Sequence, residues 1–160
     1  MPEKKFQKRV INLLLDIKEA LVTNRRQEAD SNDNQVILEQ IDSVDSFLDF
    51  DDSLADRQTK KDVTRRLKRL GGETMKKAVT NSMNRVMSNS LQGEFNLCGQ
   101  NKPGCYPKRA FNNTRFFSVV KDVALAAHPT AKEVGVRKAI KDHLACAPFR
   151  LGGGGKKNIL

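Results

Sequence analysis

The first 27 residues carry apolar side chains at intervals typical of an amphipathic helix. The apolar positions alternate four and three residues apart, at Phe6, Val10, Leu13, Ile17 and Ala20, and most residues between them are charged or polar. This alternation places side chains on one helix face, so the sequence predicts a helix over residues 3–24. The heptad spacing suits a partner helix, which is either the chain's own core or, through self-association, a second copy.

Residues 28–56 contain ten acidic side chains and neither lysine nor arginine. A polar linker is followed by a second apolar repeat at Ile37, Ile41, Val44 and Leu48, between acids at Glu39, Asp42, Asp45 and Asp49. This pattern predicts an acidic linker and helix with the acids facing outward. The acids form either a solvated surface or an internal mimic of nucleic-acid phosphate that screens the basic half of the chain.

The helical pattern is strongest over residues 57–150. One stripe contains Val63, Leu67 and Leu70; a helix over about residues 73–90 carries Met75, Ala78, Val79, Met83, Val86, Met87 and Leu91. A third stripe, Phe116, Val120, Val123, Ala124 and Ala127, ends at His128-Pro129, and a last one, Val136, Ile140 and Leu144, follows a Thr130–Glu133 capping box. The sequence predicts an all-α fold, a basic domain of about four to five helices, with a flexible basic tail over residues 151–160.

The stretch VTRRLKRLGGETMKKAV places Gly71 and Gly72 between two basic amphipathic segments. A phosphate-binding loop would need a buried strand before it and a G-x-x-x-x-G-K-[ST] pattern, and neither is present here. Glycine readily adopts the left-handed conformation that ends a helix, and Lys68 and Arg69 precede the pair, where cations suit the negative end of the helix dipole. The two glycines therefore predict a corner between two helices.

The chain has a formal net charge of +10, and its charged residues are unevenly distributed along the sequence. Residues 57–160 hold 22 of the 29 basic side chains and six of the 19 acids. Such an excess in one part of the chain favours binding to a polyanion, most simply nucleic acid, although it encodes no sequence specificity.

The candidate chemistry of the chain points away from an enzyme. Cys98, Cys105 and Cys146 lack zinc-knuckle spacing, and His128 and His143 fit no nucleophile–base–orienter order. We therefore expect reduced thiols and no metal, cofactor or small-molecule substrate. The apolar run INLLL is too short to span a membrane, so we expect an intracellular protein, in the nucleus or elsewhere, without a signal peptide or membrane segment.

Three stretches carry a resemblance: VTRRLKRLGG, AVTNSMNRVMSNSLQGEFNLCGQ and FFSVVKDVALAAHPTAKEVGVRKAIKDHLACA. Over residues 45–150 they resemble domain-of-unknown-function family 4806, in which a leucine-ended helix runs into a glycine pair and a final helix opens with threonine. More distantly, the order of helices is similar to that of BEN domains, all-helical DNA-binding modules of chromatin regulators. That similarity implies DNA contacts by the last helix and the segment after it, at Arg137, Lys138, Lys141, Arg150, Lys156 and Lys157.

Two functions from different classes remain open at the level of sequence. The first is a non-enzymatic module that binds nucleic acid, DNA in particular, in a chromatin-related, transcription-related or mobile-element-derived protein. The alternative is a protein–protein interaction or oligomerisation module with no nucleic-acid partner, in which residues 3–24 self-associate and charge sets the pairing.

Overall fold

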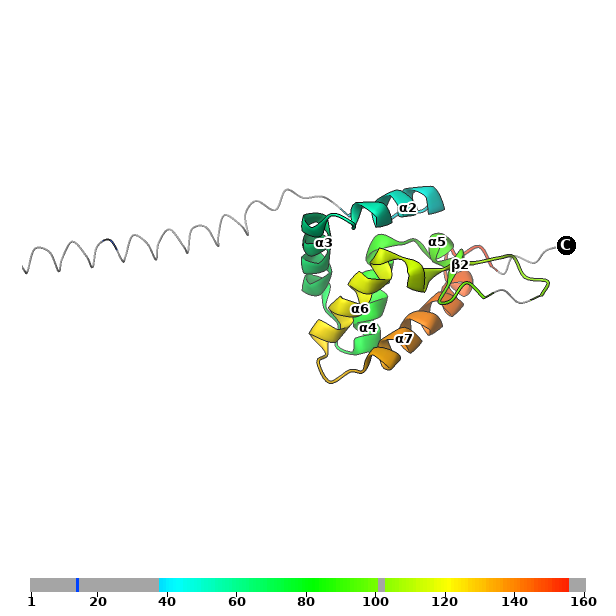
Figure 1. The fold of residues 1–160 in the computed structure, drawn as a ribbon. Helices are drawn as coiled ribbons and strands as arrows, with labels where there is room; N and C mark the ends of the chain where they lie inside the picture. The colour runs from blue at the N-terminus through cyan, green and yellow to red at the C-terminus, as the bar shows by residue number, and fades with distance from the viewer. Residues whose placement is uncertain (1–13, 15–37, 101–102, 156–160) are drawn as a thin grey trace, which may run out of the picture. The chain divides into compact units, whose positions relative to one another are not determined.

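A computed structural model describes Leu14, residues 38–100 and residues 103–155, and residues from Leu38 onward form one compact unit (Figure 1). Its helices are α2 (Val44–Ser53), α3 (Arg57–Leu70), α4 (Met75–Val86), α5 (Asn89–Gly93), α6 (Arg115–Ala127) and α7 (Glu133–Cys146), with 3₁₀ turns η1 (Phe111–Asn113) and η2 (Ala147–Phe149). The all-α prediction is confirmed. The predicted helix over residues 3–24, apart from Leu14, and the end of the tail lie outside the described residues.

Helix α6 is the element around which the domain packs, because α3, α4 and α7 all contact it. Its buried side chains are Phe116, Phe117, Val119, Val120, Val123 and Ala124, which cover more than one face of the helix. The stripes predicted for the neighbouring helices point toward this core: Val63 and Leu67 of α3, and Val136, Ile140 and Leu144 of α7, are buried. The 3.6-residue period therefore identified the inward faces of both helices, except that Leu70, the last residue of α3 and the third of its predicted stripe, is 45% exposed.

Aromatic side chains join segments that are far apart in the sequence. Phe47 of α2 lies edge-on to Phe95, at 5.2 Å between ring centroids, and to Phe116 of α6, at 6.0 Å. Phe111 of η1 continues the cluster, 6.0 Å from Phe95 and 6.1 Å from Phe116. Edge-to-face pairs at these distances add attraction beyond the burial of their area. The cluster therefore fixes α2 and the loop after α5 against the start of α6.

The glycine pair forms the helix corner that the sequence predicted. Gly71 ends α3 with a φ of 54°, in the left-handed region that glycine adopts without steric cost. At Gly72 an added Cβ would lie 2.4 Å from the Ala78 backbone nitrogen, so only glycine permits the close approach of this corner to α4. Asn81 donates a hydrogen bond of 2.9 Å to the Gly71 carbonyl, which holds the corner in place.

The acidic segment differs from its prediction in its helix boundary and in one core position, whereas Glu39, Asp42, Asp45 and Asp49 are exposed as predicted. Residues 38–43 are not helical; Ile41 instead forms a parallel bridge with Met87. Within α2, Phe47 is buried whereas Leu48, a predicted core position, is exposed. The compact unit begins at Leu38, and Phe47 packs within it on aromatic rings that only the tertiary fold brings to it.

Two further predictions about helix ends were wrong. The helix expected over residues 73–90 is interrupted, because Met87 is extended and Ser88 caps the short helix α5. The last helix begins at Glu133, and Lys132, with no side-chain cap, takes the position before it in place of the Thr130 capping box.

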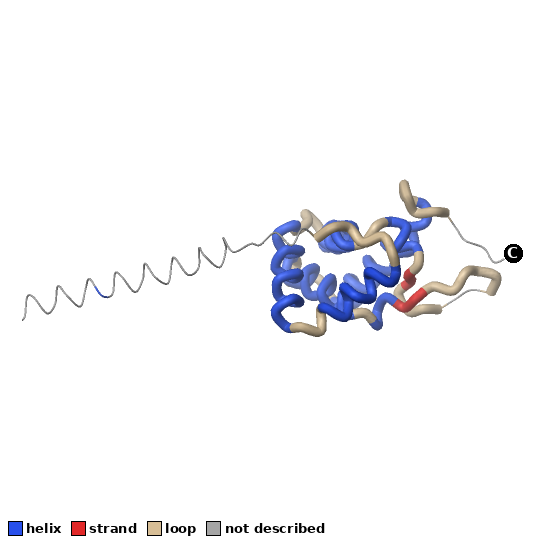
Figure 2. Tube along the Cα trace, turned by 90° about the horizontal axis from the view of Figure 1, so that it is seen from above, coloured by secondary structure: helices blue, strands red, loops and turns tan. Residues whose placement is uncertain are grey.

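The loop between α5 and α6 contains the only strands among the described residues. They are β1 (Phe95–Asn96) and β2 (Arg109–Ala110), paired in parallel with Phe95 opposite Arg109. Figures 1 and 2 show these strands at the opposite side of the domain from α3.

Asp51 of α2 binds the N-terminus of α6. Its carboxylate accepts hydrogen bonds from the backbone N–H of Phe116, at 2.8 Å, and of Arg115, at 3.1 Å. The side chain of Arg115 also reaches Asp52, at 2.9 Å. These amides belong to the first turn of α6, where no partner exists within the helix and where the dipole favours negative charge. One buried carboxylate thus satisfies two donors and ties the acidic segment to the central helix.

Asp51→Asn should lower the free energy of unfolding by about 1–2 kcal/mol, because the amide keeps one acceptor oxygen but loses the charge at the helix end. Asp49→Asn, an exposed change on the same helix, is the matched control and should alter stability by less than about 0.5 kcal/mol. Urea unfolding of both variants measures the difference. Equal losses would show that the Asp51 contacts contribute nothing specific.

Candidate nucleic-acid interface

Helix α3 presents the highest density of positive charge among the described helices. Asp56 begins it by accepting a hydrogen bond of 2.8 Å from the Thr59 N–H, and this bond, with one from the Thr59 hydroxyl, lowers the pKa of Asp56. Val63 and Leu67 then face the core. The remaining faces carry seven basic residues against one acid, Asp62. Burial of the apolar stripe therefore turns the cations toward solvent.

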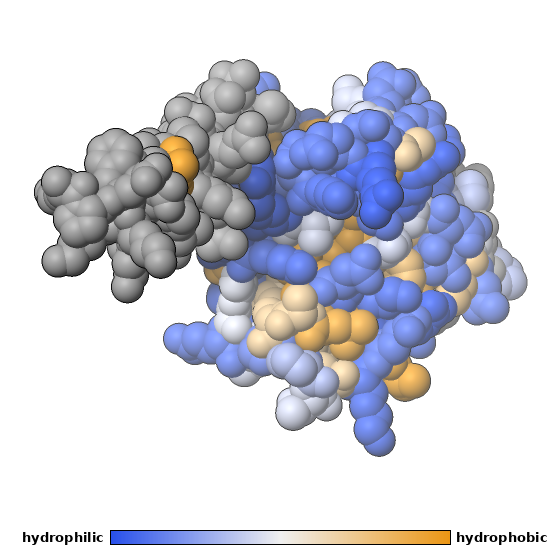
Figure 3. Space-filling view, turned by 60° about the vertical axis from the view of Figure 1, so that its left-hand side comes forward, coloured by the Kyte–Doolittle hydropathy of each residue, from blue (hydrophilic) through white to orange (hydrophobic). Residues whose placement is uncertain are grey.

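An open groove runs along α3 beside α6. Its lining consists of Arg57, Lys60, Lys61, Thr64, Arg65, Lys68 and Arg69 from α3, with Asp122 from α6. Six of these eight side chains are basic, so the groove combines a concave surface with positive potential. Figure 3, which brings the α3 side of the domain forward, shows hydrophilic residues over much of this face.

Two cations of the groove contact neighbouring polar side chains. Arg65 lies 3.1 Å from Asp62, and both side chains are substantially exposed, so the pair is weak and screened by salt. Lys60 donates to the Ser118 hydroxyl at 3.3 Å. Of the α2 acids, Asp51 and Asp52 contact the start of α6 rather than this groove.

The last helix carries its predicted contact residues on a less basic surface. Lys138 and Lys141 are exposed, whereas Arg137 is half-buried and its guanidinium carbon lies 5.4 Å from the centre of the Phe117 ring. Glu133 and Asp142 lie on the same helix and reduce its net charge. Lys156 and Lys157 lie outside the described residues. Among the described residues of this set of six, Lys138 and Lys141 are exposed and Arg137 is half-buried, and the nucleic-acid contacts of the set stay a prediction.

Arg150, one of those six, has a role inside the fold. Its guanidinium donates to the Gln92 side-chain oxygen at 3.0 Å and to the backbone carbonyl of His143. It also lies 3.4 Å from the Asn89 side-chain oxygen. These contacts join the segment after α7 to α5 and give Arg150 a structural role, while its contact with phosphate stays a prediction.

A buried polar network surrounds His143, and no sequence motif indicated it. The His143 Nε2 atom lies 3.2 Å from the Asn84 side-chain oxygen, and Nδ1 lies 3.0 Å from Arg150. The Arg150 guanidinium also lies 3.1 Å from Nε2, and a neutral ring accepts from it through the nitrogen that carries no proton. Gln92 also donates to the Asn84 oxygen, at 3.0 Å. Burial, and then the charge of Arg150, lower the pKa of His143 to about 4.

No metal centre is formed by the described residues, because no three His, Cys, Asp or Glu side chains gather in them. Cys98, Cys105 and Cys146 are exposed free thiols. Over the same residues, no helix is both long and apolar enough to cross a membrane.

The chain matches no family model, no curated protein and no solved structure. The resemblance to domain-of-unknown-function family 4806 and to BEN domains therefore stays a prediction.

The neutral state of His143 predicts that acid destabilises the fold. The pKa rises from about 4 in the folded protein to 6.5 in the unfolded chain. Between these values the unfolded state binds more protons, so the stabilisation is fully present above pH 6.5 and is lost as the pH falls to about 4. We expect a loss of about 2 kcal/mol after allowance for partial solvation of the ring.

Urea unfolding between these pH values should show this loss in the wild-type protein and a smaller one in His143→Gln, whose amide does not titrate. His128→Gln is the control and should retain the pH dependence. If the free energy of unfolding changed with pH by the same amount in the wild type and in His143→Gln, His143 would be excluded as the source of the pH dependence.

Proposed function

We propose that this protein is a non-enzymatic nucleic-acid-binding module, with DNA as the favoured ligand, and that the α3 groove is its phosphate-binding surface. The observation that carries the proposal is the set of six basic side chains lining one groove with a single acid, Asp122. A nuclear location would accompany this function.

The spacing of the cations supports a backbone contact. Arg57, Lys61 and Arg65 follow each other at four-residue intervals, so they rise about 6 Å per step along the helix and share one face. Such a row can contact successive phosphates of one strand. Contacts with phosphate position a protein on nucleic acid without reading its sequence. We therefore expect salt-dependent binding with little preference for sequence.

The alternative function is a protein–protein interaction module without a nucleic-acid partner. It is favoured by Tyr106 and Phe149, which are 51% and 68% exposed at the other side of the domain. The two functions use different surfaces, so variants of one surface distinguish them.

Replacement of Arg57, Lys61 and Lys68 by Ala should weaken binding of the full chain to duplex DNA and reduce its salt dependence. If each cation neutralises one phosphate, the slope of log K against log salt should fall in magnitude by about 2 to 3. The three side chains are exposed, so the fold should persist. Fluorescence anisotropy over a series of salt concentrations measures both quantities, with single-stranded DNA and RNA as competing ligands.

The matched variant replaces Arg137, Lys138 and Lys141 of α7 by Ala and removes the same formal charge. This variant should retain most of the affinity for duplex DNA. Its slope of log K against log salt should stay steeper than that of the α3 variant. A larger loss of DNA affinity in the α7 variant would indicate that the last helix is the binding site. Equal losses of affinity would indicate diffuse electrostatic attraction that does not depend on the α3 groove. Absence of DNA binding by the wild-type chain at low salt would overturn the proposal.

A further inference from the structure

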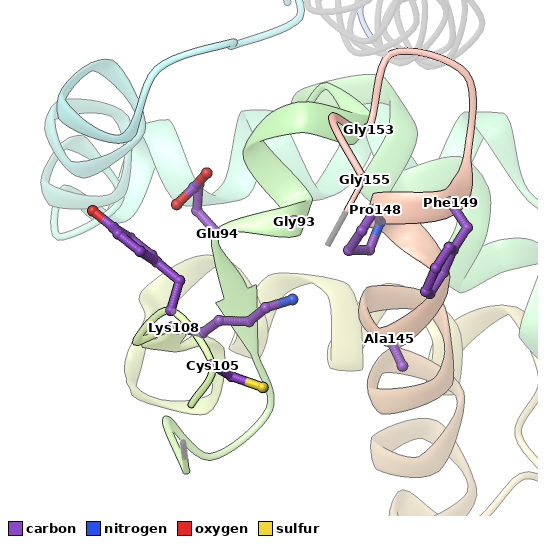
Figure 4. A pocket seen from close by; sticks show the side chains of 10 residues that line it. Gly93, Glu94, Cys105, Lys108, Ala145, Pro148, Phe149, Gly153 and Gly155 are labelled. Carbon is purple, nitrogen blue, oxygen red and sulfur yellow. The ribbon is translucent and has the colours of Figure 1, made fainter. Parts of the chain in front are cut away.

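A second recess lies at the side of the domain opposite α3, between the β1–β2 loop and the segment after α7 (Figure 4). It has a volume of about 140 Å³, enough for one large side chain. Ala145, Pro148 and Phe149 form one wall, and Cys105 and Lys108 form the other. The proposed nucleic-acid groove shares none of these residues.

Exposed apolar side chains gather around this recess. Tyr106 and Phe149 line it, and Leu151, two residues beyond Phe149, is 98% exposed. Isolated apolar side chains on a surface need no explanation, but aromatic residues beside an apolar hollow are typical of the centre of a protein–protein interface.

One wall of the recess is held in place before any ligand binds. The Gly155 N–H donates to the Pro148 carbonyl at 2.9 Å, and the Gly153 N–H donates to the Arg150 carbonyl at 2.8 Å. Arg150 is itself tied to His143 and Gln92. At Gly153 an added Cβ would lie 2.1 Å from the Ala147 carbonyl oxygen, so the backbone packs closely there. A preformed wall lowers the entropic cost of binding.

Charge at the recess indicates the nature of its ligand. Figure 4 shows the Lys108 side chain extending into the space between the loop and Pro148, whereas the Glu94 carboxylate points away on the other side. Arg109 follows Lys108 and lines an adjoining hollow with Tyr106, Pro107 and Glu94. Lys108 and Arg109 outnumber Glu94, the one acid that lines the recess and this hollow, so an acidic ligand is favoured over a basic one.

A protein segment fits these features better than a nucleic-acid base. The described loop residues 103–110 contain two cations, Lys108 and Arg109, and a strand of nucleic acid would need a longer row of them. Pro148 and Ala145 add aliphatic surface to the recess, which suits a leucine or phenylalanine side chain. We propose that this recess binds an apolar or aromatic side chain presented by an acidic segment of a partner protein.

The proposal can be tested with defined peptides and the full chain. The probes are Ser-Glu-Glu-X-Glu-Glu-Ser peptides in which X is Phe, Leu, Ala or Ser, titrated while amide chemical shifts are recorded by NMR. The Phe and Leu peptides should shift the amides of Gly93, Ala145 and Gly153. They should bind at least about tenfold more tightly than the Ala peptide, because burial of such a side chain contributes more than a tenfold change in affinity.

Two variants locate the site. Ala145→Leu fills the recess from an exposed helix position and should weaken the Phe peptide about tenfold, whereas Ala126→Leu, an exposed change on α6, should not. Lys108→Glu should weaken the acidic peptide and strengthen one in which Lys replaces each Glu. The α3 triple variant should bind the peptides normally, so this proposal and the proposed function can fail separately.

Three outcomes would overturn the proposal. The first is equal binding of all four peptides, which would indicate charge attraction alone. The second is the absence of shifts at the recess amides at millimolar peptide. The third is a ten-nucleotide oligo-dT that shifts those amides and loses this effect in Ala145→Leu, which would make the recess a base-binding site.

Discussion

The bond between the Asp51 carboxylate and the first turn of α6 determines how the domain is assembled. Helices α2, α3, α4 and α7 all pack on α6, so its start lies where backbone amides have little access to water. A carboxylate from α2 satisfies two of those amides and opposes the positive end of the helix dipole. Phe47, one turn earlier on α2, packs on Phe116 in the same region. Because the polar and the apolar contact act together, the acidic segment becomes part of the core unit.

This use of the acids has a consequence for the basic half of the chain. Asp51 and Asp52 are directed to α6 and Arg115, and the α3 groove contains one acid. The cations of α3 are presented on a helix held to α6 by Val63 and Leu67, so their backbone positions are fixed. The other side of the domain offers an apolar recess with one lysine extending into it. The two surfaces suit a small module that contacts a polyanion and a protein at once.

The net charge of the chain overstates how many basic side chains are available to bind a polyanion at the protein surface. Arg150 contributes to the positive balance of the chain, yet its guanidinium bonds to His143 and Gln92 within the fold. Arg137 lies over the Phe117 ring, where part of its side chain packs against the core. Cations that hold the fold together and cations that face solvent cannot be distinguished by composition, because both contribute equally to the formal charge.

The sequence by itself determined the features that depend on neighbours within a few turns. It predicted the inward faces of α3, α6 and α7 and the corner at Gly71, because the helix period and glycine's backbone freedom are local properties. It also showed that residues 57–70 are strongly basic. Only the tertiary structure decided that Asp51 caps α6, that Arg150 lies within a network, and that the cations of α3 line a groove beside Asp122. Each of these depends on residues more than fifty positions apart, and their approach follows from packing of the whole core rather than from any local pattern.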